Sequence, residues 1–312
     1  YKRQKVDHIK DDDTFGGVFG VTKGLAKKYS RKRVIDTPIA EHITLSTAVG
    51  AAATGLRPIA ELMFNDFIGF GLDPILNQGA KMRYMFGGKA KIPLVVRTVH
   101  GTGASAAAQH SQSLYNMFAA IPGVKVVVPS NPYDAKGLLM SAIQEDNLVV
   151  FSEDKTLLGQ KGNVPEEPYT IEIGKANVTR EGDDLTIVAI GKMVAVAEET
   201  AEKLAEDQVS VEVIDLRSVS PWDQETVLDS VKKTGRLIVI DESNPQCNIA
   251  GDVASVIGDV GFDYLDGPIK KVTAPDTPVP FAANLEAAYM PNADKVLDIA
   301  SELIDDLKKA NA

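Results

Sequence analysis

Short apolar runs alternate with helical patterns along the first half of the chain. Strands are expected from the apolar runs at residues 33–35, 57–64, 92–99, 124–130 and 147–153, and helices between them over residues 41–55, 73–87, 112–120 and 132–146. Strands made almost continuously of Val, Ile and Leu and separated by helices are typical of a parallel sheet that is covered on both faces. The first half is therefore predicted to be an α/β domain.

The same alternation returns in the second half after an interruption. Residues 156–184 combine glycine, proline and mixed charge with little periodicity, which is typical of a linker. Beyond them, strands are expected at residues 185–191, 209–216, 236–242 and 269–275, and helices over residues 194–206, 223–233, 251–260 and 294–309. The pattern predicts two parallel-sheet α/β domains, at residues 1–155 and 185–312, joined by this linker.

Two of the expected helices carry clear local signals. The first has Asp73 at a capping position and Pro74 at the first helical position, and the pair Gly87 and Gly88 is expected to end it. The second has apolar residues on one face, at Val194, Ala197, Ala201 and Leu204. At helical spacing this stripe is expected to face the core.

Composition and charge exclude several classes of protein. Hydrophobic residues make up 44% of the chain, and no apolar run approaches the roughly 18 residues that a membrane span requires. A formal charge of −10 argues against a nucleic-acid partner, because phosphate binding needs clustered Lys and Arg. The single cysteine, Cys247, cannot form an internal disulfide, so we expect a cytoplasmic protein in which Cys247 is buried. Since the chain begins at Tyr1, we also expect an N-terminal part to be missing.

Two motifs resemble ligand sites but have simpler explanations. The loop GTGASA at residues 101–106 follows a predicted strand and matches the dinucleotide fingerprint, yet no Asp or Glu occurs from Gly101 to Tyr133 to bind a ribose. A flexible glycine loop explains it better. Three consecutive acids at residues 11–13 point in different directions in an extended loop, so a solvated acidic loop is favoured over a metal site.

The histidines and one glutamate are stronger candidates. Of His8, His42, His100 and His110, the last two flank the Gly/Ala/Ser loop beyond the carboxyl end of a strand, where open α/β sheets bind ligands. Glu41 begins a helix of small residues. An acid in the first turn gains about 0.3 to 1 kcal/mol from the helix dipole, which is a sufficient structural reason for its presence. The small residues behind it, however, predict a crowded and poorly hydrated position.

Several segments, taken in order, resemble the E1 β subunits of thiamine-diphosphate-dependent 2-oxo acid dehydrogenase complexes. They are GGVFGVTKGL at residues 16–25, residues 33–67, residues 73–90, AAAQHSQS at residues 106–113 and residues 128–143, and the resemblance continues through residues 213–223 and 237–242. Residues 15–25, 61–67 and 83–90 look most like the members that act on acetoin. The resemblance implies a transketolase-like pyrimidine-binding domain followed by a transketolase C-terminal domain.

The resemblance also implies roles for individual residues. Glu41 would hydrogen-bond N1′ of the cofactor aminopyrimidine and so promote loss of the thiazolium C2 proton. Phe67 would stack on the aminopyrimidine, with Met63 and Ile39 as apolar neighbours, and His110 would face the reacting carbon and the incoming lipoyl group. Some family members bind a structural potassium ion through main-chain carbonyls, which here match those of Leu94, Ala142, Ile143, Glu145 and Asn147.

One absence and one departure qualify the resemblance. The GDG motif that holds the cofactor diphosphate and Mg²⁺ does not occur in this sequence. An E1 α subunit is therefore expected to supply that half of the site in an α2β2 heterotetramer, with a lipoyl-bearing E2 as a further partner. Family members also carry about 30 more residues before the segment near Asp11, as the resemblance implies.

The function expected from the resemblance is that of an E1 β subunit that cleaves acetoin and passes an acetyl group to lipoamide. An E1 β subunit for pyruvate or a branched-chain 2-oxo acid is the alternative with the same cofactor. A catalytically silent assembly subunit is the alternative in a different class.

Overall fold

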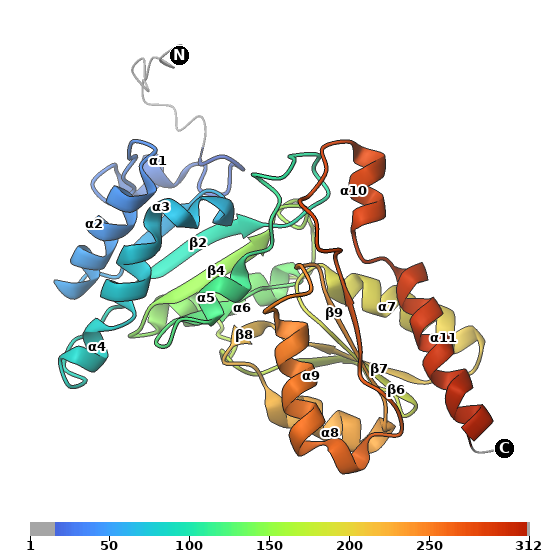
Figure 1. Cartoon of the computed structure of the whole chain (residues 1–312). Coiled ribbons are helices and arrows are strands. Elements are labelled where there is room, and N and C mark those ends of the chain that lie inside the picture. The colour runs from blue at the N-terminus through green and yellow to red at the C-terminus, as the bar shows by residue number, and fades with distance from the viewer. Residues whose placement is uncertain (1–15, 311–312) are drawn as a thin grey trace.

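The computed structural model describes residues 16–310, and their side chains as far as residue 304. Two five-stranded sheets lie beside each other, with helices packed on their faces (Figure 1). In both sheets the strands run parallel except for one antiparallel strand at an edge. The predicted class, two parallel-sheet α/β domains, is confirmed.

The first sheet has the order β1-β2-β4-β3-β8. Its strands are β1 (Ile59–Leu62), β2 (Val95–His100), β3 (Lys125–Val127), β4 (Val149–Asp154) and β8 (Ser218–Ser220). All six residues of β2 are buried, as expected for a central strand covered on both faces. The helical segments that accompany this sheet are α1 (Leu25–Tyr29), α2 (Glu41–Ala53), η1 (Asn65–Phe67), α3 (Ile68–Asp73), η2 (Pro74–Gly79), α4 (Met82–Met85), α5 (Tyr115–Ala119) and α6 (Pro132–Gln144).

The second sheet has the order β10-β9-β6-β7-β5. Its strands are β5 (Asn177–Arg180), β6 (Leu185–Ala189), β7 (Val211–Asp215), β9 (Leu237–Asp241) and β10 (Lys270–Thr273). Its helices are α7 (Met193–Glu206), α8 (Gln224–Thr234), α9 (Ile249–Val260), η3 (Phe262–Tyr264), α10 (Ala283–Tyr289) and α11 (Ala293–Ala310). The predicted apolar stripe of α7 is buried, with Ala197 and Ala201 fully covered. Strand β5 lies within residues 156–184, the segment expected to be the linker.

The two domains share one hydrophobic core. A single cluster of buried side chains runs from Leu45 and Phe118 in the first half to Val188, Trp222 and Val253 in the second. A separate cluster fills the space between the second sheet and helices α7 and α11. The continuous cluster fixes the relative position of the two sheets, because a close-packed interior resists sliding.

Strand β8 crosses from the second half into the first sheet, which the sequence pattern did not predict. It pairs antiparallel with β3, and the Val128 amide donates to the Arg217 carbonyl at 2.8 Å. The Arg217 guanidinium also forms a two-pronged pair with Asp134, at 3.0 and 2.6 Å. A strand of only three residues, between the end of β7 and a helix, is too short to be recognised in a sequence pattern.

The apolar run at residues 33–35 is not a strand, so this prediction was wrong. The Val34 amide donates to the Ser30 carbonyl at 3.0 Å within a turn, and Ile35 is 71% exposed. In the described sheet the edge strand β1 pairs only with β2. A three-residue run that has no neighbouring strand gains no ladder hydrogen bonds, so apolar character alone does not make it a strand.

The helix expected over residues 73–87 is also different in the structure. Helical backbone begins at Ile68, kinks at Gly71 (φ −122°, ψ 17°) and continues through a π-helical turn towards α4, with Asp73 inside it at φ −57° and ψ −48°. Asp73 accepts from Asn77 Nδ2 at 2.7 Å instead of capping a helix. Gly71 permits the early start: a Cβ there would lie 2.4 Å from Leu45 Cδ1, so glycine lets α3 approach α2. The expected end is confirmed, since Gly87 and Gly88 follow α4 with positive φ.

Two smaller expectations were also wrong. The helix expected over residues 112–120 covers only Tyr115–Ala119, because the loop residues before it bond to side chains from other elements. Cys247 is exposed rather than buried. It has φ 50° in the turn just before α9, where Asn248 caps the helix by accepting from the Gly251 amide.

The remaining expectations concern termini and membranes. His8 and the acids at residues 11–13 lie outside the described residues. Among the helices in the described part of the chain, none combines the length and the apolar character that crossing a bilayer would need.

Candidate active site

Three of the predicted site residues lie beyond the carboxyl ends of strands in the first sheet. Met63 follows β1 directly, Phe67 ends the short helix η1, and His110 lies in the loop of residues 101–113 that follows β2. Parallel strands converge at this edge, so residues far apart in the sequence meet there. The location agrees with the one expected for His110.

His110 lies in a cluster of aromatic rings. Its ring packs edge-on against Phe67, with centroids 5.2 Å apart and planes at 82°, and against Phe64 at 4.9 Å and 80°. Phe64 in turn contacts Phe19 at 5.7 Å. These separations are those of favourable edge-to-face contacts. The structure thus joins two predicted site residues, Phe67 and His110, by direct contact.

Glu41 begins helix α2 and lies against α3, the helix that follows Phe67. A Cβ on Gly71 of α3 would lie 3.6 Å from the Glu41 carbonyl carbon, so the two backbones are close. The Glu41 side chain is half-buried, and it has no hydrogen-bond partner among residues 16–304. Ile39 is 78% exposed, so its side chain is mostly uncovered in this chain. His42, the residue after Glu41, is exposed in the first turn of α2.

The loop that carries His110 is bonded to side chains from other elements. Lys155, at the end of β4, donates from Nζ to the His110 carbonyl at 2.5 Å and to Ser111 Oγ at 3.1 Å. Asp66 Oδ1 accepts from both the backbone amide and Nε2 of Gln112, at 3.1 and 2.9 Å. Burial lowers the pKa of Lys155, while neighbouring acids oppose that effect. The backbone next to His110 is therefore fixed from two sides.

A buried network of charges lies between the two sheets, next to this loop. Lys192 Nζ lies 2.5 Å from Glu242 Oε2 and 3.2 Å from Asp154 Oδ2, and it donates to the Thr102 carbonyl at 2.9 Å. His100 Nδ1 bonds Ser152 Oγ at 2.8 Å, and its Nε2 lies 3.4 Å from Glu242 Oε1. One ligand atom each of His100, Asp154 and Glu242 lies within 4.8 Å of the other two, a spacing that could hold a metal ion. The Lys192 ammonium already occupies the cation position, so the cluster is an ion-pair network.

The pKa values in this network are strongly shifted. Burial lowers the pKa of His100 to about 4 and raises that of Asp154 to about 6. For Glu242, burial opposes ionisation, but Lys192 and His100 outweigh it and hold the pKa at about 2. Near neutral pH, the network therefore contains a neutral histidine, two carboxylates and one ammonium.

Replacing His100 by Asn should reduce the acid sensitivity of folding. His100 has a folded-state pKa below its ordinary value of 6.5, so its contribution is present above pH 6.5 and is lost as the pH falls towards 4. The loss amounts to about 3 kcal/mol of unfolding free energy. Asp154 is present in both the wild type and the variant and has the opposite effect. Its protonation in acid removes the cost of burying its charge, so it raises the unfolding free energy as the pH falls. The unfolding free energies of wild type and variant, measured at pH 7, 5.5 and 4.5, should therefore approach each other as the pH falls.

The matched control for this experiment is the exposed His42→Asn. It should leave the pH profile of unfolding parallel to that of the wild type. A His100→Asn profile that also stays parallel would contradict the assignment of acid sensitivity to His100.

The residues predicted to bind potassium lie near the amino-terminal edge of the first sheet, the opposite edge from His110. They are Leu94, Ala142, Ile143, Glu145 and Asn147. The carbonyls of Ile143 and Glu145 both accept from Arg57 Nη1 at 2.9 Å, and that of Leu94 accepts from the Val149 amide at 2.9 Å. The Arg57 guanidinium thus already brings a positive charge to two of these carbonyls. Potassium at this position stays a prediction.

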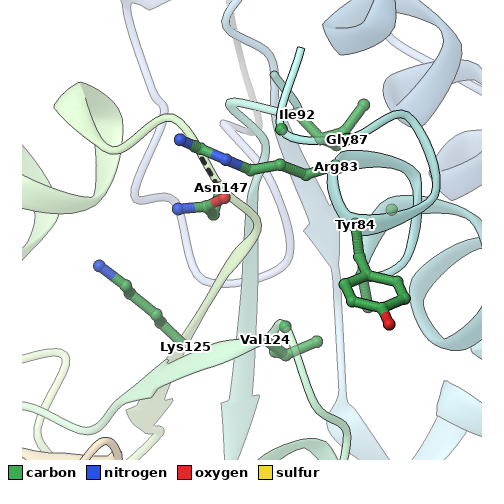
Figure 2. A pocket seen from close by; sticks show the side chains of 11 residues that line it. Arg83, Tyr84, Gly87, Ile92, Val124, Lys125 and Asn147 are labelled. Atoms are coloured by element: carbon green, nitrogen blue, oxygen red, sulfur yellow. Dashed lines mark hydrogen bonds between the residues drawn. The ribbon is translucent and has the colours of Figure 1, made fainter. Parts of the chain in front are cut away.

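A cavity of about 640 Å³ lies at the same amino-terminal edge, away from the aromatic cluster. Figure 2 shows Arg83, Tyr84, Lys125 and Asn147 around it, with Arg83 bonded to Asn147 Oδ1 at 3.0 Å. Of the predicted site residues, it includes only Asn147. This cavity therefore does not coincide with the candidate active site.

Sequence reasoning missed several residues of this site. Phe64 contacts His110 as closely as Phe67 does, and the neighbouring Asn65 is fully buried with both amide atoms unpaired among the described residues. Lys155 lies two residues beyond a predicted strand, at the end where ligands bind, and that position could have identified it. Glu242 ends the strand predicted over residues 236–242, but that strand belongs to the other domain, and Glu286 has no comparable signal.

Comparison with protein families assigns both halves of the chain. Residues 6–161 match the model of the pyrimidine binding domain of transketolase, and residues 174–296 match that of the transketolase C-terminal domain. A solved structure described as a split-gene transketolase, an inactive β4 tetramer, superposes with a TM-score of 0.75 at 24% identity, covering 90% of this chain and 86% of that one. This structural likeness supports the fold.

Two curated proteins from Bacillus subtilis (strain 168) are similar over nearly the whole chain. The β subunit of acetoin:2,6-dichlorophenolindophenol oxidoreductase is 57% identical over 96% of this chain and 87% of its own length. The β subunit of the pyruvate dehydrogenase E1 component is 44% identical over 93% of this chain and 89% of its own length. The chain is thus more similar to the acetoin protein than to the pyruvate protein of the same organism.

Proposed function

Because the chain belongs to the family of E1 β subunits that includes these acetoin and pyruvate enzymes, we propose that it is the β subunit of a thiamine-diphosphate-dependent acetoin dehydrogenase. With an α subunit, the enzyme cleaves acetoin and transfers an acetyl group to the lipoamide of an E2 component. The observation that carries the choice of substrate is the difference between 57% and 44% identity to two proteins of one organism. The enzyme works in the cytoplasm, in keeping with a single cysteine.

The residues of this chain fit the pyrimidine half of the cofactor. Glu41 offers a half-buried carboxylate without a described partner, and Phe67 offers a half-buried ring next to His110. The diphosphate half has no such fit, because Asp66, the acid next to Phe67 in the sequence, already accepts two bonds from Gln112. Bound thiamine diphosphate supplies the carbon nucleophile of the reaction. An α subunit would hold its diphosphate through Mg²⁺.

Each residue then has a defined task. Glu41 accepts and returns a proton at the aminopyrimidine, a role that suits a carboxylate kept from bulk water. Phe67, with Met63 and Ile39, supplies apolar surface that orients the heterocycle and excludes water. His110 exchanges a proton with the substrate and the lipoyl group, and the edges of Phe64 and Phe67 fix its ring.

An α subunit is expected to cover the surface beside Glu41. Large apolar side chains are exposed on and around α2, at Ile35 (71%), Ile39 (78%), Ile43 (65%) and Phe70 (70%). Several large exposed apolar side chains on neighbouring elements favour a protein interface here. With Glu41 at its margin, this interface would close the site between two chains in an α2β2 heterotetramer.

Reconstitution with the α subunit tests the proposal. The assembled enzyme is assayed for dye reduction with acetoin, pyruvate and 3-methyl-2-oxobutanoate. We expect kcat/KM for acetoin to exceed that for either 2-oxo acid by at least about 100-fold, because specificity lies in transition-state binding. A higher value for a 2-oxo acid would move the chain to the pyruvate or branched-chain class. No turnover of any substrate, with no thiamine diphosphate bound, would favour a silent assembly subunit.

A further inference from the structure

Glu286 reaches from the C-terminal domain to the loop that carries His110. It lies on the short helix α10, is 3% exposed, and accepts from the Gly103 amide at 2.8 Å through Oε1 and from the Ser105 amide at 2.9 Å through Oε2. Figure 1 shows α10 beside the segment that follows β2. Hydrogen bonds to a carboxylate are about twice as strong as neutral ones. One buried side chain thus fixes two backbone positions in the loop.

The backbone of this loop is strained, so contacts from outside the loop are needed to stabilise its conformation. Gly101 and Gly103 have φ near 100°, and Ser105 and Ala107 have φ of 50° and 59°. A residue with a side chain in this region costs about 1 to 3 kcal/mol and persists only where the surroundings impose it. The His110 amide donates to the Ala107 carbonyl at 3.3 Å, so the strained turn leads directly to the histidine.

The other contacts of the loop leave this part to Glu286. Lys155 and Asp66 hold residues 110–112, and Glu242 accepts from Ser113 Oγ at 2.7 Å. At the other end of the loop, Lys192 donates to the Thr102 carbonyl at 2.9 Å. The loop also borders a cavity of about 280 Å³, whose lining includes Ala108 and Tyr289. Residues 106–109 therefore have room to move once the bonds at residues 103 and 105 are lost.

We propose that Glu286 is a positioning residue: it holds residues 103–105 in their strained conformation and thereby sets the place of the His110 ring. The inference rests on the proposed role of His110 in the reaction. It gives the C-terminal domain, which carries none of the predicted cofactor residues, a direct part in shaping the active site.

A graded set of variants follows from the geometry. Glu286→Gln keeps one acceptor oxygen and turns an NH₂ group towards the second amide, so one of the two bonds is lost. Glu286→Ala loses both. The control is Glu302→Gln, an exposed acid on α11 of the same domain. All variants are studied in the complex reconstituted with the α subunit.

The first readout is amide hydrogen exchange, which needs no turnover. In Glu286→Ala, exchange in peptides covering residues 103–110 should be at least about tenfold faster than in the wild type, while peptides of α2 and of the β sheets are unchanged. Glu286→Gln should lie between the two, and Glu302→Gln should match the wild type. Unchanged exchange in Glu286→Ala would overturn the proposal.

The second readout separates positioning from general loosening of the site. We expect kcat for acetoin to fall about 10- to 100-fold in Glu286→Ala, as misplacing a catalytic group does, with thiamine diphosphate affinity within about twofold of the wild type. Faster exchange with an unchanged kcat, or a parallel loss of cofactor affinity, would overturn the positioning role. If the wild-type complex turns over none of the substrates, the proposed function fails, and the exchange data still decide whether Glu286 holds the loop.

Discussion

Replacing Glu41 by Gln is expected to lower kcat for acetoin by about 10²- to 10⁴-fold in the reconstituted enzyme, the range that a positioned general acid or base contributes. The amide has the volume of the acid and can still accept a hydrogen bond, but it cannot take up a proton. Thiamine diphosphate should therefore bind with an affinity within a few fold of the wild type. Rapid-quench measurement of proton exchange at C2 of the bound cofactor should show a loss of similar size.

The control distinguishes this role from the structural explanation for an acid at a helix start. Glu225 occupies the first turn of α8 and is 79% exposed. If Glu41 only complemented the helix dipole, both Glu41→Gln and Glu225→Gln would change the unfolding free energy by about 0.3 to 1 kcal/mol and leave turnover intact. Near-normal C2 exchange in Glu41→Gln would rule out the proposed proton relay.

Replacing Lys192 by Met is expected to destabilise the complex by about 3 to 5 kcal/mol, the cost of breaking a buried ion pair from one side. The ammonium balances Glu242 and Asp154 and bonds the Thr102 carbonyl, all in the buried interior. Without it, two carboxylates remain buried with no cation between them. Thermal unfolding should shift down by about 10 °C at neutral pH.

The pH dependence of this variant carries a further signature. Glu242 loses the partner that keeps its pKa at about 2, and Asp154 already has a pKa raised to about 6 by burial. Both groups can then take up protons in mild acid, so the deficit should shrink between pH 7 and pH 5. Lys203→Met is the control. It removes an exposed pair with Glu199 and Asp294, which solvent screens, and should leave the unfolding temperature close to that of the wild type. An equal shift for both variants would contradict the structural role of the buried network.

Most of the secondary structure could be predicted because its signals are local. The Val- and Ile-rich strands and the stripe at Ala197 and Ala201 reflect contacts within one layer, which a period of two or 3.6 residues records. The helix expected at Asp73 failed for a non-local reason. Gly71 allows α3 to begin earlier because it faces Leu45, and no pattern in residues 68–87 reports that neighbour.

The candidate site could be predicted only in part, for the same reason. His110 and Phe67 were identified by position and by resemblance, and the structure places their rings in contact. The side chains from the C-terminal domain that hold the histidine loop could not be predicted in this way. Glu286 bonds residues more than 180 positions away in the sequence, and a glutamate on a short helix looks like any solvated acid until the fold brings it to Gly103.

The crossing of β8 into the first sheet has a consequence for hybrid enzymes. Consider a chimaera that exchanges C-terminal halves between relatives at the apparent boundary near residue 180. Its first sheet would contain β8 and Arg217 from one relative and all the other strands from another. Grafts of this kind should therefore carry Ser130 and Asp134 from the donor, since Asp215 accepts from Ser130 and Arg217 pairs with Asp134. The natural unit of exchange in this subunit is larger than either of its two domains.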